Sequence, residues 1–479
     1  MKFIDMPSLG LSPGSVTVWR ASAPHMSDAA WTTDLRRASY VQEAHITYAL
    51  EAADDGPLPP AWLGCAFNLP SGLDMDAFAA ALRDWTDRHE VLRSQLTLSS
   101  PSTSGNRLHR MTLPPGVVSI HPSAAGDFTD GQKLARHLEE LFDSEAGPLV
   151  WPGYICATIS RPEATTVCIA ADHALTDGYS IFLTAYEIRA LYAAHAAPEN
   201  KPALPPLPPT ASYLDFAEAE RAEADALTAD HESIIRWQQF VTTAGGNLPE
   251  FPVPVGDVSG SPADQPGGYV EFLDTSAAQA FDRVCRAAGG DSFSGLLACL
   301  AKVGHEITGS DEFSAMIAFH TRLPAWRSSI GWYVGMGPVA FPVSATGSFA
   351  ETVSYAVSNL DGVNELARIP MPRVVELLGQ PLRDPFMVSY MDLRRAPGAR
   401  DWNSGRVIAL RSRSNDPDEV CFWIVRTYDG LFVNYRHPAT GPADITVPDY
   451  VARTKRLLVS LVNTARWPAT PHPIGAYRS

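Results

Sequence analysis

The sequence is poor in cysteine and has no long hydrophobic run. Its six cysteines form no C-x-x-C pair and most lie in apolar surroundings, which favours the buried, reduced thiols of a cytosolic protein. No window approaches the roughly 18 apolar residues of a transmembrane helix. The first residues lack a charged segment followed by an apolar one, so we expect no signal peptide and a cytoplasmic location.

Basic residues are also scarce. The chain has 37 Lys and Arg against 53 Asp and Glu, a formal net charge of -16. This deficit argues against broad nucleic-acid binding, which needs a basic surface, and against binding to an anionic membrane. The sequence has neither a P-loop nor a Rossmann glycine pattern, and "GDSFSG" (290–295) is not a G-x-S-x-G nucleophile elbow.

The length and the prolines predict two domains. A chain of 479 residues is too long for one ordinary core. The stretch "APENKPALPPLPPT" (197–210) carries six prolines in fourteen residues, which neither a helix nor an inner strand accommodates. We therefore expect a linker there, between an N-terminal domain of residues 1–200 and a C-terminal domain of residues 201–479.

Both halves mix helix and strand patterns, which indicates an α/β protein. Apolar residues at helical spacing predict the following helices: 74–96, 130–145, 179–195, 276–289, 292–309 and 449–465. Residues 165–173 have the pattern of a buried strand. Residues 420–437 predict a hairpin that turns at Asp429 and Gly430.

The stretch "DHALTDG" (172–178) joins the buried strand to the next helix. His173 has three interpretations: a satisfied core residue, a metal ligand together with Asp177, or a catalytic imidazole. A metal site is disfavoured because only two ligands lie here, whereas catalytic zinc needs three. For catalysis, Asp177 would fix the loop. Gly178 has no Cβ, so a substrate can approach the backbone and a backbone N–H at the helix start can face an oxyanion.

"DHALTDG" resembles the H-H-x-x-x-D-G motif of the condensation-domain superfamily, which includes peptide condensation domains and polyketide-associated acyltransferases. Further segments resemble that family in the same order: "ASYVQEAHI" (38–46), "RHEVLRSQL" (88–96), "HTRLPAWRSSIGWYVGMGPVAFPV" (320–343) and "PFMVSYMDL" (385–393). One position departs from the family pattern, since Asp172 stands where the first histidine of the pair is usual. The functional second histidine corresponds to His173.

The resemblance implies two chloramphenicol acetyltransferase-like halves, each a mixed sheet covered by helices, in a V-shaped arrangement around a central tunnel. It implies that an acyl group passes from a phosphopantetheine thioester, on a carrier protein or coenzyme A, to a small-molecule alcohol or amine. His173 would be the base, Asp177 and Gly178 would complete the site, and Arg322 from the other half would form a salt bridge with Asp177. Transfer would be direct, without a bound cofactor or metal.

The resemblance leaves several functions open. We expect first a freestanding condensation enzyme of natural-product biosynthesis, such as nonribosomal peptide synthesis, with ester preferred to amide formation. The alternative is a polyketide-associated acyltransferase of cell-wall glycolipids such as trehalose esters. An epimerisation domain and a non-catalytic docking module are the remaining possibilities.

Side chains near the motifs have simpler expected roles. The charged residues of "RHEVLRSQL" are expected to stabilise the fold, and Ser180 to cap the helix that follows the loop. A carrier protein is usually acidic, so it would need a local basic patch. The candidates are Arg36 and Arg37 in one segment and Arg394, Arg395 and Arg400 in another.

Overall fold

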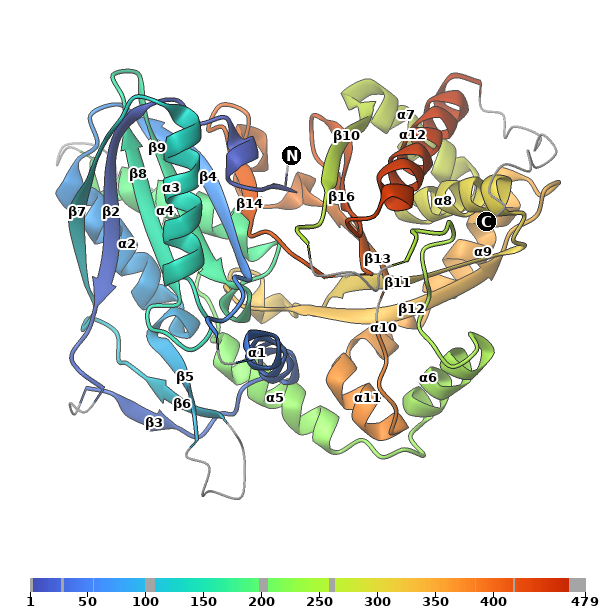
Figure 1. The fold of residues 1–479 in the computed structure, drawn as a ribbon, viewed down its shortest axis with the longest axis horizontal. Helices are drawn as coiled ribbons and strands as arrows, with labels where there is room; N and C mark the ends of the chain where they lie inside the picture. The colour runs from blue at the N-terminus through green and yellow to red at the C-terminus, as the bar shows by residue number, and fades with distance from the viewer. Residues whose placement is uncertain are drawn as a thin grey trace. The chain divides into compact units, whose positions relative to one another are not determined.

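A seven-stranded, mostly antiparallel sheet organises the N-terminal part of the chain in the computed structural model (Figure 1). In spatial order its strands are β1 (Phe3–Ile4), β14 (Ile408–Arg411), β4 (Trp62–Pro70), β9 (Ala164–Asp172), β8 (Tyr154–Ser160), β2 (Gly14–Ser22) and β7 (Ser119–Phe128). The structure describes residues 3–26, 30–54, 56–99, 108–197, 206–257, 263–383, 385–416 and 418–464.

Helices cover both faces of this sheet. They are α2 (Met75–Arg88), α3 (Gly131–Glu145) and α4 (Ser180–His195). Along β2, alternate side chains point to opposite faces. Val18 joins the core that contains Leu138 of α3, whereas the Trp19 ring meets Phe78 of α2 at 4.8 Å between centroids. The buried strand between these layers is β9, which delivers the DHALTDG loop.

A smaller sheet and two further helices complete this part of the chain. The small antiparallel sheet contains β3 (Thr32–Asp34), β6 (Leu108–Thr112) and β5 (Ser94–Leu98). The helices are α1 (Tyr40–Ala53) and α5 (Tyr213–Asp225). Ser39 and Gln42 form a capping box at the start of α1, which satisfies two backbone N–H groups there.

A six-stranded mixed sheet organises the C-terminal part. Its spatial order is β10 (Gly267–Asp274), β16 (Gly430–Arg436), β15 (Val420–Arg426), β13 (Phe386–Asp392), β11 (Glu312–His320) and β12 (Val334–Pro342). β15 and β16 form the hairpin predicted for 420–437. β13 is parallel to both β11 and β15.

Seven helices belong to the described residues of this part. They are α6 (Glu232–Thr243), α7 (Thr275–Ala287), α8 (Ser292–Thr308), α9 (Phe349–Leu360), α10 (Val363–Ala367), α11 (Met371–Leu378) and α12 (Gly441–Thr464). Side chains of α7, α8, α9 and α12 share one hydrophobic core with the sheet. The α/β class and the two sheet-and-helix halves expected from the sequence are thus confirmed.

The chain divides into two compact units. Unit 1 contains residues 1–227, 322–334 and 396–413, and unit 2 contains residues 228–321, 335–395 and 414–479. Two segments from the second half of the sequence thus pack with the first half. The predicted domain boundary at residue 200 stays a prediction, and residues 198–205 of the predicted linker lie outside the described residues.

All six cysteines are buried and none of them forms a disulfide, as predicted. No helix within the described ranges is long and apolar enough to cross a membrane.

Candidate active site

The predicted strand, loop and helix around His173 are present. β9 is buried from Thr165 to Asp172, and a short 3-10 helix of residues 173–175 follows it before α4 begins. The loop is anchored at its base, because the Asp172 N–H donates to Gly153 O at 2.9 Å and the His173 N–H donates to Ala61 O at 2.8 Å. Backbone bonds of this kind fix where the imidazole leaves the sheet.

The His173 ring is half-buried and stacks on an indole. Its centroid lies 3.9 Å from that of Trp332, with 34° between the ring planes. Nδ1 is buried and has no hydrogen-bond partner in another described residue. Burial, and next the neighbouring His45 imidazole, lower the pKa of His173 to about 4, although its own carbonyl, Asp172 and Asp177 act in the opposite direction. The imidazole is therefore neutral near pH 7, the form that can accept a proton.

Asp177 and Arg322 form a buried ion pair. Arg322 Nη2 lies 2.9 Å from Asp177 Oδ1 and 3.1 Å from Oδ2, and the two side chains are 5% and 2% exposed. Burial alone would raise the pKa of Asp177, but the Arg322 charge and the N–H donors of Ser180 and Tyr333 hold it below its ordinary value. The ion pair predicted between Asp177 and Arg322 is therefore present, and both residues lie in unit 1, which includes residues 322–334 from the second half of the sequence.

The same carboxylate caps helix α4. Asp177 Oδ1 accepts hydrogen bonds from the backbone N–H of Tyr179 at 3.1 Å and of Ser180 at 2.7 Å. Ser180 does not cap, contrary to the sequence prediction, because its hydroxyl donates to Gly331 O at 3.0 Å and accepts from Arg322 Nη2 at 2.6 Å. Gly178 lies between the capping residue and the helix start and is half-buried, and its contribution to an oxyanion site stays a prediction.

The segment of residues 330–333 is held by unit 1 side chains that accept its backbone N–H groups. The bonds are Ile330 N to His89 Nδ1 (3.4 Å), Gly331 N to Ser180 Oγ (3.2 Å) and Tyr333 N to Asp177 Oδ2 (3.0 Å). Arg322 also lies over the Tyr333 ring, 4.1 Å from its centroid. Trp332 is in the middle of this segment, so these bonds set the position of the indole against His173.

Two site residues were missed by the sequence analysis. His45 of α1 approaches Asp172, with 3.1 Å between Nε2 and Oδ1, and its ring centroid lies 6.3 Å from that of His173. Gln42, one turn earlier, donates from Nε2 to Ala174 O in the loop at 2.7 Å. The quoted segment 38–46 contains both residues, but nothing in its spacing indicates that they reach the loop.

The charged residues of "RHEVLRSQL" make internal contacts. Arg88 Nε and His89 Nε2 bind the buried Glu187 carboxylate at 2.9 and 2.5 Å. Glu90 binds Arg36 at 2.9 Å, and Arg93 donates to Leu113 O. These contacts agree with the predicted role in the fold.

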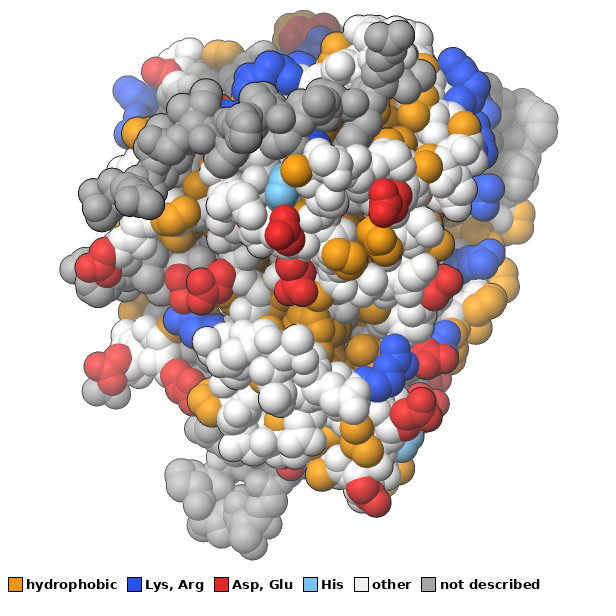
Figure 2. Space-filling model, turned by 90° about the vertical axis from the view of Figure 1, so that its right-hand side faces the viewer, with side chains coloured by type: hydrophobic (Ala, Val, Ile, Leu, Met, Phe, Trp, Pro, Cys, Tyr) orange, Lys and Arg blue, Asp and Glu red, His pale blue; other side chains and the backbone are white. Residues whose placement is uncertain are grey.

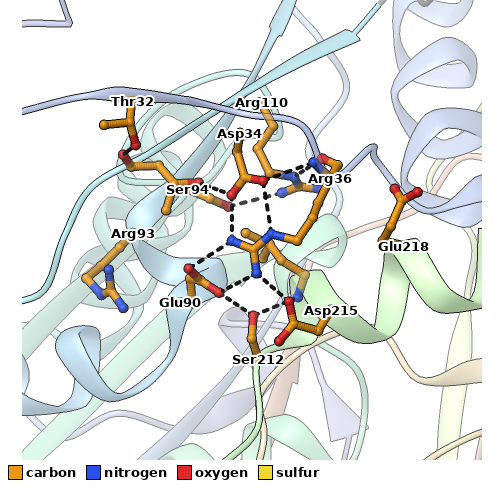
Figure 3. Close-up of polar contacts among 12 residues, drawn as sticks. Thr32, Asp34, Arg36, Glu90, Arg93, Ser94, Arg110, Ser212, Asp215 and Glu218 are labelled. Carbon is orange, nitrogen blue, oxygen red and sulfur yellow. Dashed lines mark hydrogen bonds and ion pairs between the residues drawn. The ribbon is translucent and has the colours of Figure 1, made fainter.

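Three of the arginines proposed for carrier docking are engaged in ion pairs. Figure 3 shows the Arg36 guanidinium between the carboxylates of Asp34, Glu90 and Asp215, at 2.6, 2.9 and 2.6 Å. The other two pair as follows: Arg37 with Glu218 and Asp225, and Arg394 with Asp282 and Asp392. Charges already neutralised within the chain are poor attractors of an acidic partner, so the Arg36–Arg37 patch is not supported.

Figure 2 shows acidic and basic side chains scattered over one face of the molecule.

Comparisons with known proteins identify the family of this chain and several relatives. The condensation-domain family model matches residues 62–389. Acyltransferase PapA3 of Mycobacterium tuberculosis is 27% identical over 457 residues, 93% of each chain. Trehalose-2-sulfate acyltransferase PapA2 of Mycobacterium bovis is 25% identical over 461 residues, 93% of this chain and 94% of the relative.

The fold also resembles that of a solved acyltransferase structure. The solved structure of PapA2 acyl transferase superposes with a TM-score of 0.85 at 23% identity, over 97% of this chain and 100% of that one. The names of the relatives match the glycolipid alternative better than the natural-product function expected first. Since the family model covers more than half of its length, this chain belongs to the condensation-domain family, and it is an acyltransferase.

Proposed function

We propose that this enzyme transfers an acyl group from a phosphopantetheine thioester to a hydroxyl group of a trehalose-type disaccharide. The observation that carries the proposal is similarity along 93% of the chain to a protein named trehalose-2-sulfate acyltransferase. The likeness extends across both compact units, so it includes the His173 loop and the segment that packs against it. The product is an ester, because the acceptor is an alcohol.

The proposed reaction uses His173 as the proton carrier. The neutral imidazole accepts the proton of the sugar hydroxyl while that oxygen attacks the thioester carbonyl. The C–S bond of the resulting tetrahedral intermediate then breaks, and the proton passes from the imidazolium to the leaving thiolate. The ester forms, the free thiol is released, and the imidazole returns to its neutral form. A base in this position typically contributes about 10²–10⁴-fold to the rate.

The residues around His173 have supporting roles in this proposal. Asp177, bound to Arg322 and to the start of α4, positions the loop and does not reach the reacting atoms. We place the backbone N–H of Gly178 toward the oxyanion, where a donor at a helix start stabilises developing negative charge. The chemistry needs no resident cofactor, since the thioester itself supplies the activated acyl group. The donor is coenzyme A or a carrier protein bearing the same arm.

Incubation with palmitoyl-coenzyme A and trehalose tests the proposal. We expect mass spectrometry to detect a monoacylated trehalose, and a thiol reagent to report one equivalent of free coenzyme A for each ester. The His173→Ala variant is the control for enzyme-dependent transfer. Acylation of an amine such as glycine ethyl ester in place of trehalose would contradict the proposal and support the peptide-type reaction.

A further inference from the structure

A second imidazole lies beside His173. His45 is on α1, and its side chain is 12% exposed. Its Nε2 contacts the carboxylate of Asp172, a residue that is only 1% exposed. Asp172 Oδ1 also accepts the Ala174 N–H at 2.8 Å, so this carboxylate is fixed by the loop that carries His173.

The contact with Asp172 determines which nitrogen of His45 is available. A carboxylate only accepts hydrogen bonds, so Nε2 carries the proton in this pair. In the neutral imidazole, Nδ1 is then a hydrogen-bond acceptor. Nδ1 has no hydrogen-bond partner among the residues that the structure describes. The partly exposed side chain therefore presents an oriented, unused acceptor atom.

The neighbouring rings place the His45 imidazole beside His173. The His45 ring meets the Trp332 indole edge-on, with 5.6 Å between centroids and 78° between planes, while His173 stacks on the same indole. Since His173 Nδ1 is buried, Nε2 is the nitrogen of His173 that a substrate can reach. The two imidazoles thus offer one acceptor nitrogen each, on rings 6.3 Å apart.

We propose that His45, oriented by Asp172 and Trp332, binds a second hydroxyl group of the acceptor while His173 takes the proton from the reacting hydroxyl. A sugar ring carries neighbouring hydroxyl groups that can bridge two such nitrogens, whereas a simple alcohol has only one hydroxyl to offer. The inference rests on the proposed function and extends it, because it makes His45 the residue that selects a polyhydroxylated acceptor. Asp172 takes part as a positioning residue.

The His45→Gln variant tests this role. A glutamine amide can still donate to Asp172 in the place of Nε2, so the contact that supports the fold is kept while the Nδ1 acceptor is lost. Loss of one neutral hydrogen bond predicts that KM for trehalose rises about 3–10-fold, with kcat changed less than about twofold. KM for palmitoyl-coenzyme A and the melting temperature should match those of the wild type.

His195→Gln is the matched control. His195 pairs with Asp84 at 2.7 Å near the end of α4, so it is also a histidine–aspartate pair of unit 1, but it makes no contact with His173. Its kinetic constants should be those of the wild type.

Binding of trehalose should also be measured by calorimetry, where His45→Gln is expected to raise the Kd for trehalose by a similar factor.

The possible results distinguish a failure of the inference about His45 from a failure of the proposed function. If wild-type enzyme acylates trehalose and His45→Gln does so with unchanged KM and Kd, then His45 only supports the fold and the inference is wrong. The inference would also be overturned if His45→Gln raised KM equally for a polyhydroxylated acceptor such as glycerol and for a single-hydroxyl acceptor such as ethanol. If the wild type neither binds nor acylates trehalose, the proposed function fails, and the inference fails with it.

Discussion

His173 combines a fixed backbone with a ring that burial keeps neutral. The strand that ends before it is buried from Thr165 to Asp172, and the indole of Trp332 covers one face of the ring. Removing water from an imidazole disfavours its charged form. The site therefore has a proton acceptor ready at neutral pH, although one that is weaker than a free histidine.

This environment predicts the pH dependence of the reaction. The base works only when unprotonated, and its pKa is lowered from 6.5 to about 4. The value of kcat/KM should stay level from roughly pH 8 to roughly pH 5.5 and fall as the pH drops through about 4. Initial rates over this range, with circular dichroism at each pH to follow the fold, make the measurement. An acid limb centred near the ordinary value of 6.5 would contradict this environment.

Asp177 has a different role, and its loss should mainly reduce stability. Asp177→Asn keeps the size of the side chain but removes the charge that faces buried Arg322. Breaking a buried ion pair costs about 3–5 kcal/mol, which urea denaturation can measure. Asp84→Asn removes a partner of the half-exposed His195 and should cost less than about 1 kcal/mol. Equal stability of the two variants would show that the Asp177–Arg322 pair contributes no more than a surface contact.

At the scale of elements, the segment of residues 330–333 forms a strap across the start of α4. Its backbone donates to side chains from the RHEVLRSQL segment, from the loop and from the helix start. In the family-like segment 320–343, Gly331 allows a close approach to Tyr213, and the next residue, Trp332, covers His173.

Gly331→Ala tests the strap. A Cβ at this position would lie 2.3 Å from Tyr213 Cδ2, and Tyr213 is 1% exposed, so its ring has little room to move. Overpacking of this kind costs about 1–3 kcal/mol, and the displaced Trp332 should also lower kcat. Gly441→Ala is the control because nothing lies within 4 Å of its Cβ position. A Gly331→Ala enzyme with wild-type stability and rate would show that the strap tolerates displacement.

The helix predictions differ from the structure where a pattern continues past a turn. The helix predicted for 74–96 ends at Arg88, and residues 90–93 form a 3-10 helix before β5. Apolar spacing cannot detect this change, because it depends on tertiary contacts. His89 binds Glu187 of α4, and Glu90 binds Arg36. The helix predicted for 449–465 begins earlier, at Gly441, and continues through Pro448, a residue type that usually interrupts a helix.

At the scale of the molecule, the sequence was sufficient to predict the fold class and the His173 loop. Both depend on local patterns and on ordered motifs along the chain. The Asp172–His45 contact joins residues 127 positions apart, and neither residue stands in a motif that pairs them. The carboxylate partners of Arg36, Arg37 and Arg394 could not be predicted for the same reason. Tertiary contacts decide whether the charge of a surface arginine is available to a binding partner. The V-shaped arrangement and its tunnel stay predictions.

The central claim is that His173 is the base of acyl transfer to a sugar hydroxyl, and single-turnover measurement of His173→Ala tests it most directly. Enzyme in excess over palmitoyl-coenzyme A, with saturating trehalose, reports the chemical step without product release. The expected rate of ester formation is about 10²–10⁴-fold below that of the wild type, with an unchanged melting temperature. A decrease of less than about tenfold in a folded variant would show that His173 does not act as the base.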